Sequence, residues 1–178
     1  MHVETERLRL RDLEDRDWEA MLAIESDAEA VRYQSYEPRT AAECIAYLAR
    51  ERASRTPHRW CYDLAVTLAD SGRLVGRVGL DIKAPERSVG ELWFILDRSQ
   101  WGRGLMPEAA RALVDVGFRE KGLHRVFLEC DPRNAGAVRL AEKLGMKREG
   151  QLRQHGFYKG EWCDCLYYGV LAGEWKAP

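Results

Sequence analysis

The stretch of residues 88–122 constrains the fold of this 178-residue chain most strongly. It begins with the apolar run Val89 to Leu96, which is long enough for one buried strand. Trp-Gly-Arg-Gly-Leu-Met follows at 101–106, and an amphipathic pattern then predicts a helix from Pro107, with Glu108 complementing the dipole of its first turn. A strand, a glycine turn and a helix start direct free backbone N–H groups at one point, which favours an anion.

Two glycines alone do not identify that anion. A nucleotide-binding P-loop requires Lys followed by Ser or Thr after its last glycine, and this chain has Leu105 and Met106 there. A dinucleotide-binding fingerprint requires a third glycine three residues after the second, where Pro107 stands. The sequence therefore excludes both loops.

A second pattern of the same kind follows. Arg125 to Cys130 reads as a strand, and Asn134 is placed to cap a helix predicted from Ala135 to Leu144. Gly145 closes that helix. The chain thus carries strand, turn and helix twice in succession.

The two blocks resemble the Gcn5-related N-acetyltransferase (GNAT) superfamily, whose diphosphate-binding loop reads Gln/Arg-x-x-Gly-x-Gly/Ala. Gly104 matches this loop, whereas Trp101 and Met106 depart from it. The wording Trp-Gly-x-Gly followed by Glu-Ala, with the opening Thr-Glu-Arg-Leu, resembles the branch that acetylates ribosomal-protein N-termini. In the second block the family writes Asn-x-x-Ser/Ala and Glu-Lys-x-Gly-Phe, matched here by Asn134, Ala137, Glu142, Lys143, Gly145 and Met146.

The order of elements argues for a mixed α+β sheet rather than a doubly wound parallel one. The resemblance implies a single domain over residues 1–178, with a mostly antiparallel sheet of about seven strands, splayed between the fourth and fifth, and about four helices. Gly76 and Gly79 inside one strand predict a bulge or a close backbone approach. Strands are expected at 4–11, 61–68, 73–83, 89–97, 125–130, 147–153 and 162–171, and helices at 18–25, 40–55, from 107 and at 135–144.

The resemblance implies acetyl-CoA as cosubstrate. Main-chain N–H groups from Gly102 to Met106 are expected to bind its diphosphate, with Arg103 as an added cation, and the splay is expected to free main-chain groups at Ile95 and Leu96. The Asn134 amide is expected to meet the pantetheine arm. The expected cosubstrate-binding residues are Ile95, Leu96, Trp101, Gly102, Arg103, Gly104, Leu105, Met106, Asn134, Ala137 and Lys143.

Glu91 is the candidate general base, because a carboxylate inside an apolar strand is unfavourable unless it is solvated or paired. An equal alternative is a carboxylate that anchors the substrate or an Arg. Relatives donate a proton to the leaving thiolate from Ser or Tyr, where this chain has Ala137 and Ala141. Tyr167 or a water molecule is the expected substitute.

The acceptor side is expected to include Tyr33, Tyr36 and His155, which border it in the resembled family. Simple packing of the two tyrosines and a solvated loop histidine are the alternatives. The leading function is acetyl transfer to a protein or peptide N-terminal amine. Acetylation of a small amine such as a polyamine or an aminoglycoside, and CoA binding without catalysis, remain open.

The charge, the apolar runs and the cysteines of the chain limit the classes of binding partner and the compartment that we expect. With 28 basic and 29 acidic residues the chain has no overall field that attracts nucleic acid or an anionic membrane. No apolar run approaches the ~20 residues that span a bilayer, and the N-terminal residues are charged, so the cytoplasm is expected. Five scattered cysteines fit free thiols, and Cys163-x-Cys165 is too close for a zinc knuckle, so no metal is expected. A homodimer is left open.

Overall fold

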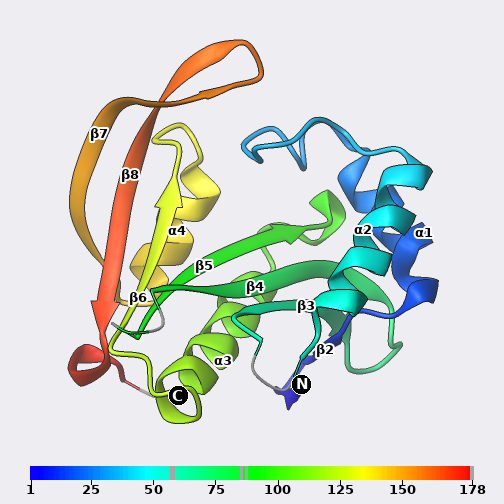
Figure 1. The fold of residues 1–178 in the computed structure, drawn as a ribbon, viewed down its shortest axis with the longest axis horizontal. Helices are drawn as coiled ribbons and strands as arrows, with labels where there is room; N and C mark the ends of the chain where they lie inside the picture. Colours follow the sequence, from blue (N-terminus) through cyan, green and yellow to red (C-terminus); the bar gives the residue numbers. More distant parts are fainter. Residues whose placement is uncertain (57–58, 85, 87, 177–178) are drawn as a thin grey trace.

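The computed structural model describes residues 1–56, 59–84, 86 and 88–176 (Figure 1). The strands are β1 (His2–Glu4), β2 (Leu8–Asp12), β3 (Cys61–Leu68), β4 (Leu74–Ala84), β5 (Val89–Leu96), β6 (Arg125–Cys130), β7 (Lys147–Tyr158) and β8 (Glu161–Leu171). The helices are α1 (Trp18–Glu25), α2 (Ala41–Ser54), α3 (Leu105–Arg119) and α4 (Ala135–Lys143), with short 3-10 turns η1 (Asp15–Asp17), η3 (Arg98–Gln100) and η4 (Ala172–Glu174).

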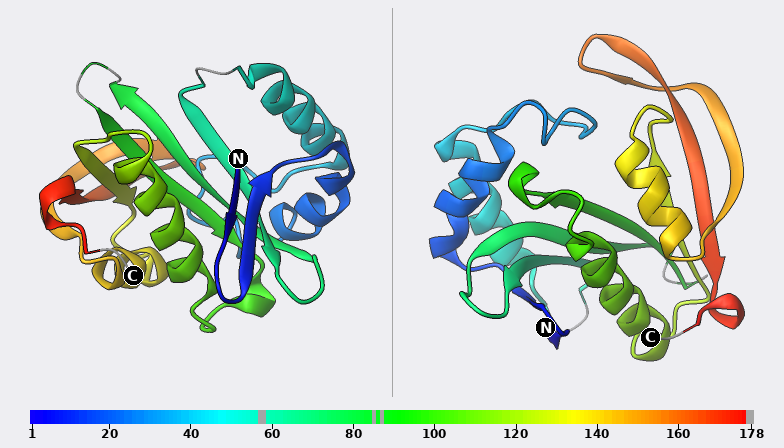
Figure 2. Two further views of the ribbon diagram at one scale, coloured as in Figure 1. Left: turned by 90° about the horizontal axis from the view of Figure 1, so that it is seen from below. Right: turned by 180° about the vertical axis from the view of Figure 1, so that it is seen from behind.

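All strands join one eight-stranded sheet in the order β1-β2-β3-β4-β5-β6-β8-β7. Every neighbouring pair is antiparallel except β5 and β6. Helices α3 and α4 pack on one face over the larger hydrophobic core, and α1 and α2 cover the other face (Figure 2). The predicted mixed α+β class with about four helices is therefore confirmed.

The sheet splits between β5 and β6, as predicted. The parallel ladder joins only Val89 to Arg125, Gly90 to Val126 and Glu91 to Phe127. Beyond Glu91 the two strands diverge, and Figure 1 shows them fanning apart towards one end of the molecule. Among the described residues no strand lies beside the edge of β5 past this point, so its main-chain groups need other partners.

The predicted first strand, Glu4 to Arg11, is wrong as a single element. It is a hairpin of β1 and β2 whose turn is fastened to α3, because the Glu108 carboxylate accepts hydrogen bonds from Thr5 Oγ1 at 2.6 Å and from the Arg7 N–H at 2.9 Å. This hairpin accounts for eight strands instead of about seven.

Two further boundaries differ from the prediction. Helix α3 begins at Leu105 rather than Pro107, because Gly104 adopts a left-handed φ of 76° and caps the helix. Strand β7 continues to Tyr158, so His155 lies in a strand and not in a loop. The sequence also predicts a turn at 84–87, between the strands expected at 73–83 and 89–97, and residues 85 and 87 lie outside the described residues. The Asn134 cap is confirmed, because its side chain accepts a hydrogen bond from the Ala137 N–H.

A buried ionic network joins α1 and α2 to the sheet. Arg77, only 2% exposed in β4, pairs with Asp63 of β3 and, at 2.7 Å, with Glu25 of α1. The Tyr47 hydroxyl of α2 donates to Asp63 at 2.6 Å. Arg39, in the connection between the helices, lies 2.8 Å from Glu25. Each charge thus has an opposite partner inside the protein, which offsets its loss of hydration.

Replacing Asp63 with Ala should lower the free energy of unfolding by about 3–5 kcal/mol, because it leaves the Arg77 charge buried with a carboxylate already shared with Arg39. Urea unfolding measures the change. The control is Asp15→Ala, which removes the exposed pair with Arg52 and should change stability by less than about 1 kcal/mol. Equal effects of both substitutions would contradict this role of the network.

Candidate active site

Two clefts meet where the sheet splits. The first, of about 390 Å³, lies between the end of β5, the start of α3 and helix α4. The second, of about 470 Å³, lies on the α1 and α2 face and reaches the β7–β8 hairpin. Arg32, Tyr33 and Gln34, in the connection between α1 and α2, line both clefts. The clefts therefore share one boundary, and groups bound in each would meet there.

The first cleft collects the residues that the sequence predicts for cosubstrate binding. Gly102 and Gly104 both have a left-handed φ of 76°, which shapes the chain into a concave loop before α3. The first N–H groups of α3 have no carbonyl partner within the helix and face the anion position with the positive end of the helix dipole. Every predicted cosubstrate residue except Arg103 lines this cleft.

Arg103 is directed elsewhere. Its guanidinium donates to the buried Gln100 side chain at 2.7 Å, and its carbonyl accepts from Arg7 at 3.0 Å. These contacts brace the loop from behind. The main chain, rather than a cation from this side chain, is thus the feature of the loop that suits a diphosphate.

The register of β5 decides which main-chain groups face the split. Phe94 O accepts from the Gln34 side chain, and Leu96 O accepts from the Trp101 indole, each at 3.0 Å. Because one residue's N–H and C=O point to the same edge of a strand, the N–H groups of Phe94 and Leu96 also face the split. The N–H of Asp97 donates to Val75 O of β4 at 2.8 Å, so the N–H of Ile95, two residues earlier, also points to β4 and away from the split. Sequence reasoning missed Phe94.

The floor of the second cleft comes from β4 and β5. Trp93 lies flat against Gly79, where any Cβ atom would overlap the indole ring, which explains the close approach predicted for this glycine. The Trp93 indole N–H donates to Asp81 at 3.3 Å. Asp81 stands directly opposite Glu91 in the ladder, so both carboxylates project from the same face.

Lys83 holds these two like charges together. Its ammonium is 2.9 Å from Glu91 and 3.5 Å from Asp81. The pairing raises the pKa of Lys83 against the opposing effect of burial. The Lys83 side chain is half exposed, so this primary ammonium reaches its carboxylates from the solvent side of the cleft.

A second polar group lies on β6, β7 and β8. His155 Nε2 is 4.0 Å from Glu129 and 3.3 Å from the Tyr167 hydroxyl, and the Tyr167 ring stacks on Phe127. Burial and then Glu129 raise the pKa of Tyr167, so its hydroxyl stays protonated at neutral pH. His155 and Glu129 line the acceptor cleft. Tyr167 is not among the lining residues, and its hydrogen bond to His155 connects it to the cleft.

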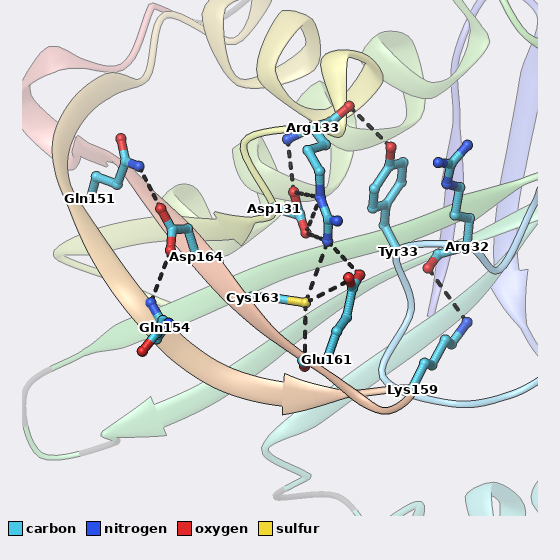
Figure 3. Close-up of polar contacts among 10 residues, drawn as sticks. All are labelled: Arg32, Tyr33, Asp131, Arg133, Gln151, Gln154, Lys159, Glu161, Cys163 and Asp164. Carbon is cyan, nitrogen blue, oxygen red and sulfur yellow. Dashed lines mark hydrogen bonds and ion pairs between the residues drawn. The ribbon is translucent and has the colours of Figure 1, made fainter.

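The outer rim is built around Arg133, in the turn before α4 (Figure 3). Its guanidinium binds Asp131 at 2.6 Å and Glu161 at 2.8 Å, and also contacts Cys163. The Tyr33 hydroxyl donates to the Arg133 carbonyl at 3.2 Å. Tyr33 and Tyr36 both line this cleft, as the sequence predicts.

Asp81, Lys83 and Glu129 were not predicted as site residues. Asp81 and Lys83 alternate along β4 with the same parity, and Glu129 ends an apolar run, so each pattern places a charge on one sheet face. Which face borders the cleft follows only from tertiary packing. In the described part of the chain, no three His, Cys, Asp or Glu side chains are arranged to hold a metal ion. None of the described helices is long and apolar enough to cross a membrane.

Comparison with known proteins agrees with this geometry. A family model described as "Acetyltransferase (GNAT) domain" matches residues 7–147. The chain belongs to the GNAT family. Its architecture is also that of a crystal structure titled as a GNAT-family acetyltransferase from Bacillus anthracis, with a TM-score of 0.88 and 29% identity over 98% of this chain and 100% of the other.

Two relatives of similar length differ in whether their names state a substrate. The uncharacterized N-acetyltransferase YnaD of Bacillus subtilis is 29% identical over 99% of this chain and 100% of its own. The spermidine N(1)-acetyltransferase of Escherichia coli is 26% identical over 96% of this chain and 91% of its own. This chain is accordingly a GNAT-type N-acetyltransferase, and its acceptor is a separate question.

Replacing Gly104 with Val should raise the Kd for CoA at least about tenfold, because a β-branched residue strongly disfavours the left-handed φ that forms the loop. Side-chain crowding is not the cause, since the nearest atom to an added Cβ is an Arg7 nitrogen at 3.6 Å. Isothermal titration calorimetry measures the Kd.

The matched control is Gly122→Val, which has the same kind of left-handed φ, at 65°, and open space around it. Gly122 follows α3 at its far end, so this variant should lose stability while keeping its CoA affinity. Unchanged affinity in Gly104→Val would overturn the assignment of the loop.

Proposed function

We propose that this chain transfers an acetyl group from acetyl-CoA to a cationic primary amine. The observation that carries the proposal is the meeting of the two clefts at the split between β5 and β6. One cleft has the donor groups for a diphosphate and the other has carboxylates for an ammonium. An amine and a thioester carbonyl must approach each other directly in this reaction, and the shared boundary provides the place.

Each step has a candidate group in the chain. The N–H groups at residues 102–106 bind the diphosphate, and those of Phe94 and Leu96 are oriented to polarise the carbonyl. Acetyl-CoA supplies the activated acyl group as a thioester. Glu91 removes one proton from the acceptor ammonium, and the neutral amine then attacks the thioester carbonyl. The nitrogen loses its second proton as the amide forms, and this proton balances the one that the leaving thiolate takes up. The C–S bond breaks, and Tyr167, acting through His155, or water returns a proton to the thiolate.

Direct transfer in a ternary complex is favoured over an acyl-cysteine intermediate. Cys130, Cys163 and Cys165 all line the acceptor cleft. Burial raises the pKa of Cys130 to about 11 and that of Cys165 to about 12, and it raises that of Cys163 as well. A thiol that stays protonated at neutral pH is a poor nucleophile.

The charges of the acceptor cleft bear on the identity of the amine. Six carboxylates and six Lys or Arg side chains line it. Arg39 and Arg77 are neutralised by Glu25 and Asp63 behind the wall, which leaves six carboxylates against four cations. This excess favours a cationic acceptor.

Two acceptor classes fit this excess. A protein or peptide N-terminal amine is the class suggested by the loop wording of the ribosomal-protein branch. A polyamine is the second candidate, because a cleft with more carboxylates than cations suits a molecule with several ammonium groups, and the E. coli relative is named for spermidine.

An amine panel tests the function and separates the classes. Free thiol released from acetyl-CoA should rise above the hydrolysis blank with peptides of varied first residue, with spermidine or with an aminoglycoside. The control is a peptide whose N-terminal amine is already blocked as an amide, so that it has no free amine, and it should give the blank rate. Preference for spermidine over every peptide would select the polyamine. Tight CoA binding with no release for any amine would favour a CoA-binding module and refute the proposal.

Replacing Glu91 with Gln should lower kcat at least about tenfold and alter the acid limb of the pH–rate profile, because the base is lost. The Kd for CoA should stay within about a factor of two, because Glu91 lines the acceptor cleft and does not line the cosubstrate cleft. Glu120→Gln, an exposed position after α3, is the control and should change neither quantity. An unaltered pH profile would remove Glu91 as the base and direct attention to Glu129.

A further inference from the structure

The turn of the β7–β8 hairpin has an unfavourable residue. Tyr158 pairs with Glu161, which leaves Lys159 and Gly160 as a two-residue turn. Both have a left-handed φ, 50° and 82°, as the twist of such a hairpin requires. Asn, Asp or Gly is preferred at the first of these positions, and Lys adopts this conformation with strain. The residue preference of this turn therefore does not explain a lysine at position 159.

The Lys159 side chain makes a contact that none of the residues preferred at this turn position could make. The Lys159 ammonium donates to Val31 O at 2.7 Å and to Arg32 O at 3.5 Å, in the connection between α1 and α2. Figure 3 shows the contact with the Arg32 carbonyl. The contact spans the rim of the acceptor cleft and joins two parts of the chain that are more than a hundred residues apart. It is a charge-assisted hydrogen bond, which is stronger than one between neutral groups.

The segment that Lys159 holds is the boundary between the clefts. Within it, Tyr33 is fastened to the Arg133 carbonyl and Gln34 to the Phe94 carbonyl at the split. Arg32, Tyr33 and Gln34 line both clefts, whereas Lys159 lines the acceptor cleft. Lys159 thus anchors this segment on its acceptor side, together with the contact of Tyr33 with Arg133.

We propose that Lys159 is a positioning residue, which ties the hairpin to residues 31–34 so that the acceptor is held against the boundary where it reacts. The inference rests on the proposed function for its kinetic consequence. Its structural part, the bridge itself, stands independently. The strain at the turn persists because a residue better suited to the turn lacks a cation that can reach the carbonyls.

The test is Lys159→Asn, which improves the turn and removes the bridge. The acceptor KM should rise at least about threefold with a smaller change in kcat, as expected when ground-state binding is lost. The Kd for CoA should stay within about a factor of two, because Gln34 still holds the other side of the segment. The thermal unfolding midpoint should be unchanged or higher, which a merely structural role would not produce.

Lys159→Arg is the matched control, since it keeps both the cation and the strained turn. Its acceptor KM should stay within about a factor of two of the unsubstituted protein. Hydrogen exchange without substrates gives a readout independent of activity. The Val31 amide, which donates to Asp27 O, and the Gln34 amide, which donates to Val31 O, should exchange at least about threefold faster in Lys159→Asn.

An unchanged acceptor KM, a lower unfolding midpoint or unchanged exchange in Lys159→Asn would overturn the proposal, as would an Arg variant that behaves like the Asn variant. If the unsubstituted protein acetylates no amine, the proposed function fails. The exchange rates then still decide whether the bridge holds the segment in solution.

Discussion

The loss of main-chain pairing between β5 and β6 is the constraint on which the site depends. Three residue pairs join these strands, and beyond Glu91 no strand in the described part of the chain lies beside the edge of β5. Buried main-chain groups without partners are unfavourable. The chain answers with side chains, Gln34 and Trp101, which reach in to bind the carbonyls of Phe94 and Leu96. The N–H groups of the same residues are left for a ligand, and the two clefts meet at that edge.

The face that carries the acceptor cleft is stabilised by charge rather than by apolar contact alone. Arg77 stands in the middle of β4, where an apolar residue would ordinarily pack, and it binds carboxylates from α1 and β3. Tyr36 and Tyr47 pack against the neighbouring guanidinium of Arg39. A wall made in this way keeps polar groups next to the cleft while each buried charge has a partner.

The sequence was informative where local chemistry decides the structure. The Asn134 cap and the glycine turn before α3 follow from short patterns, and both are present. The helix expected at 40–55 begins with a capping box of Thr40 and Glu43, which is also a short local pattern. The element boundaries were less predictable, because Gly104 rather than Pro107 starts α3 and because contacts with Glu108 fold the first strand into a hairpin. The α+β class followed from the order of the predicted elements, whereas the split in the sheet came from the family resemblance.

The candidate site also has one part that local sequence motifs predict and one part that they do not. The cosubstrate residues lie in two contiguous motifs, so sequence alone could gather nearly all of them. The acceptor cleft is assembled from single residues on β4, β5, β6 and the hairpin, and their convergence depends on strand register and packing. Asp81, Lys83, Phe94 and Glu129 each lack a local signal that distinguishes them from ordinary strand residues. Their relevance emerges only in three dimensions.

The shared boundary at Arg32, Tyr33 and Gln34 has a thermodynamic consequence. Because the same three residues line both clefts, a molecule that orders them from one cleft incurs the loss of their conformational entropy for both. The second molecule then associates with a segment that is already ordered. Because linkage is reciprocal, the factor by which the thioester strengthens amine association equals the factor by which the amine strengthens thioester association. Coupling of this kind requires no movement of the sheet or the helices, only a segment that both clefts share.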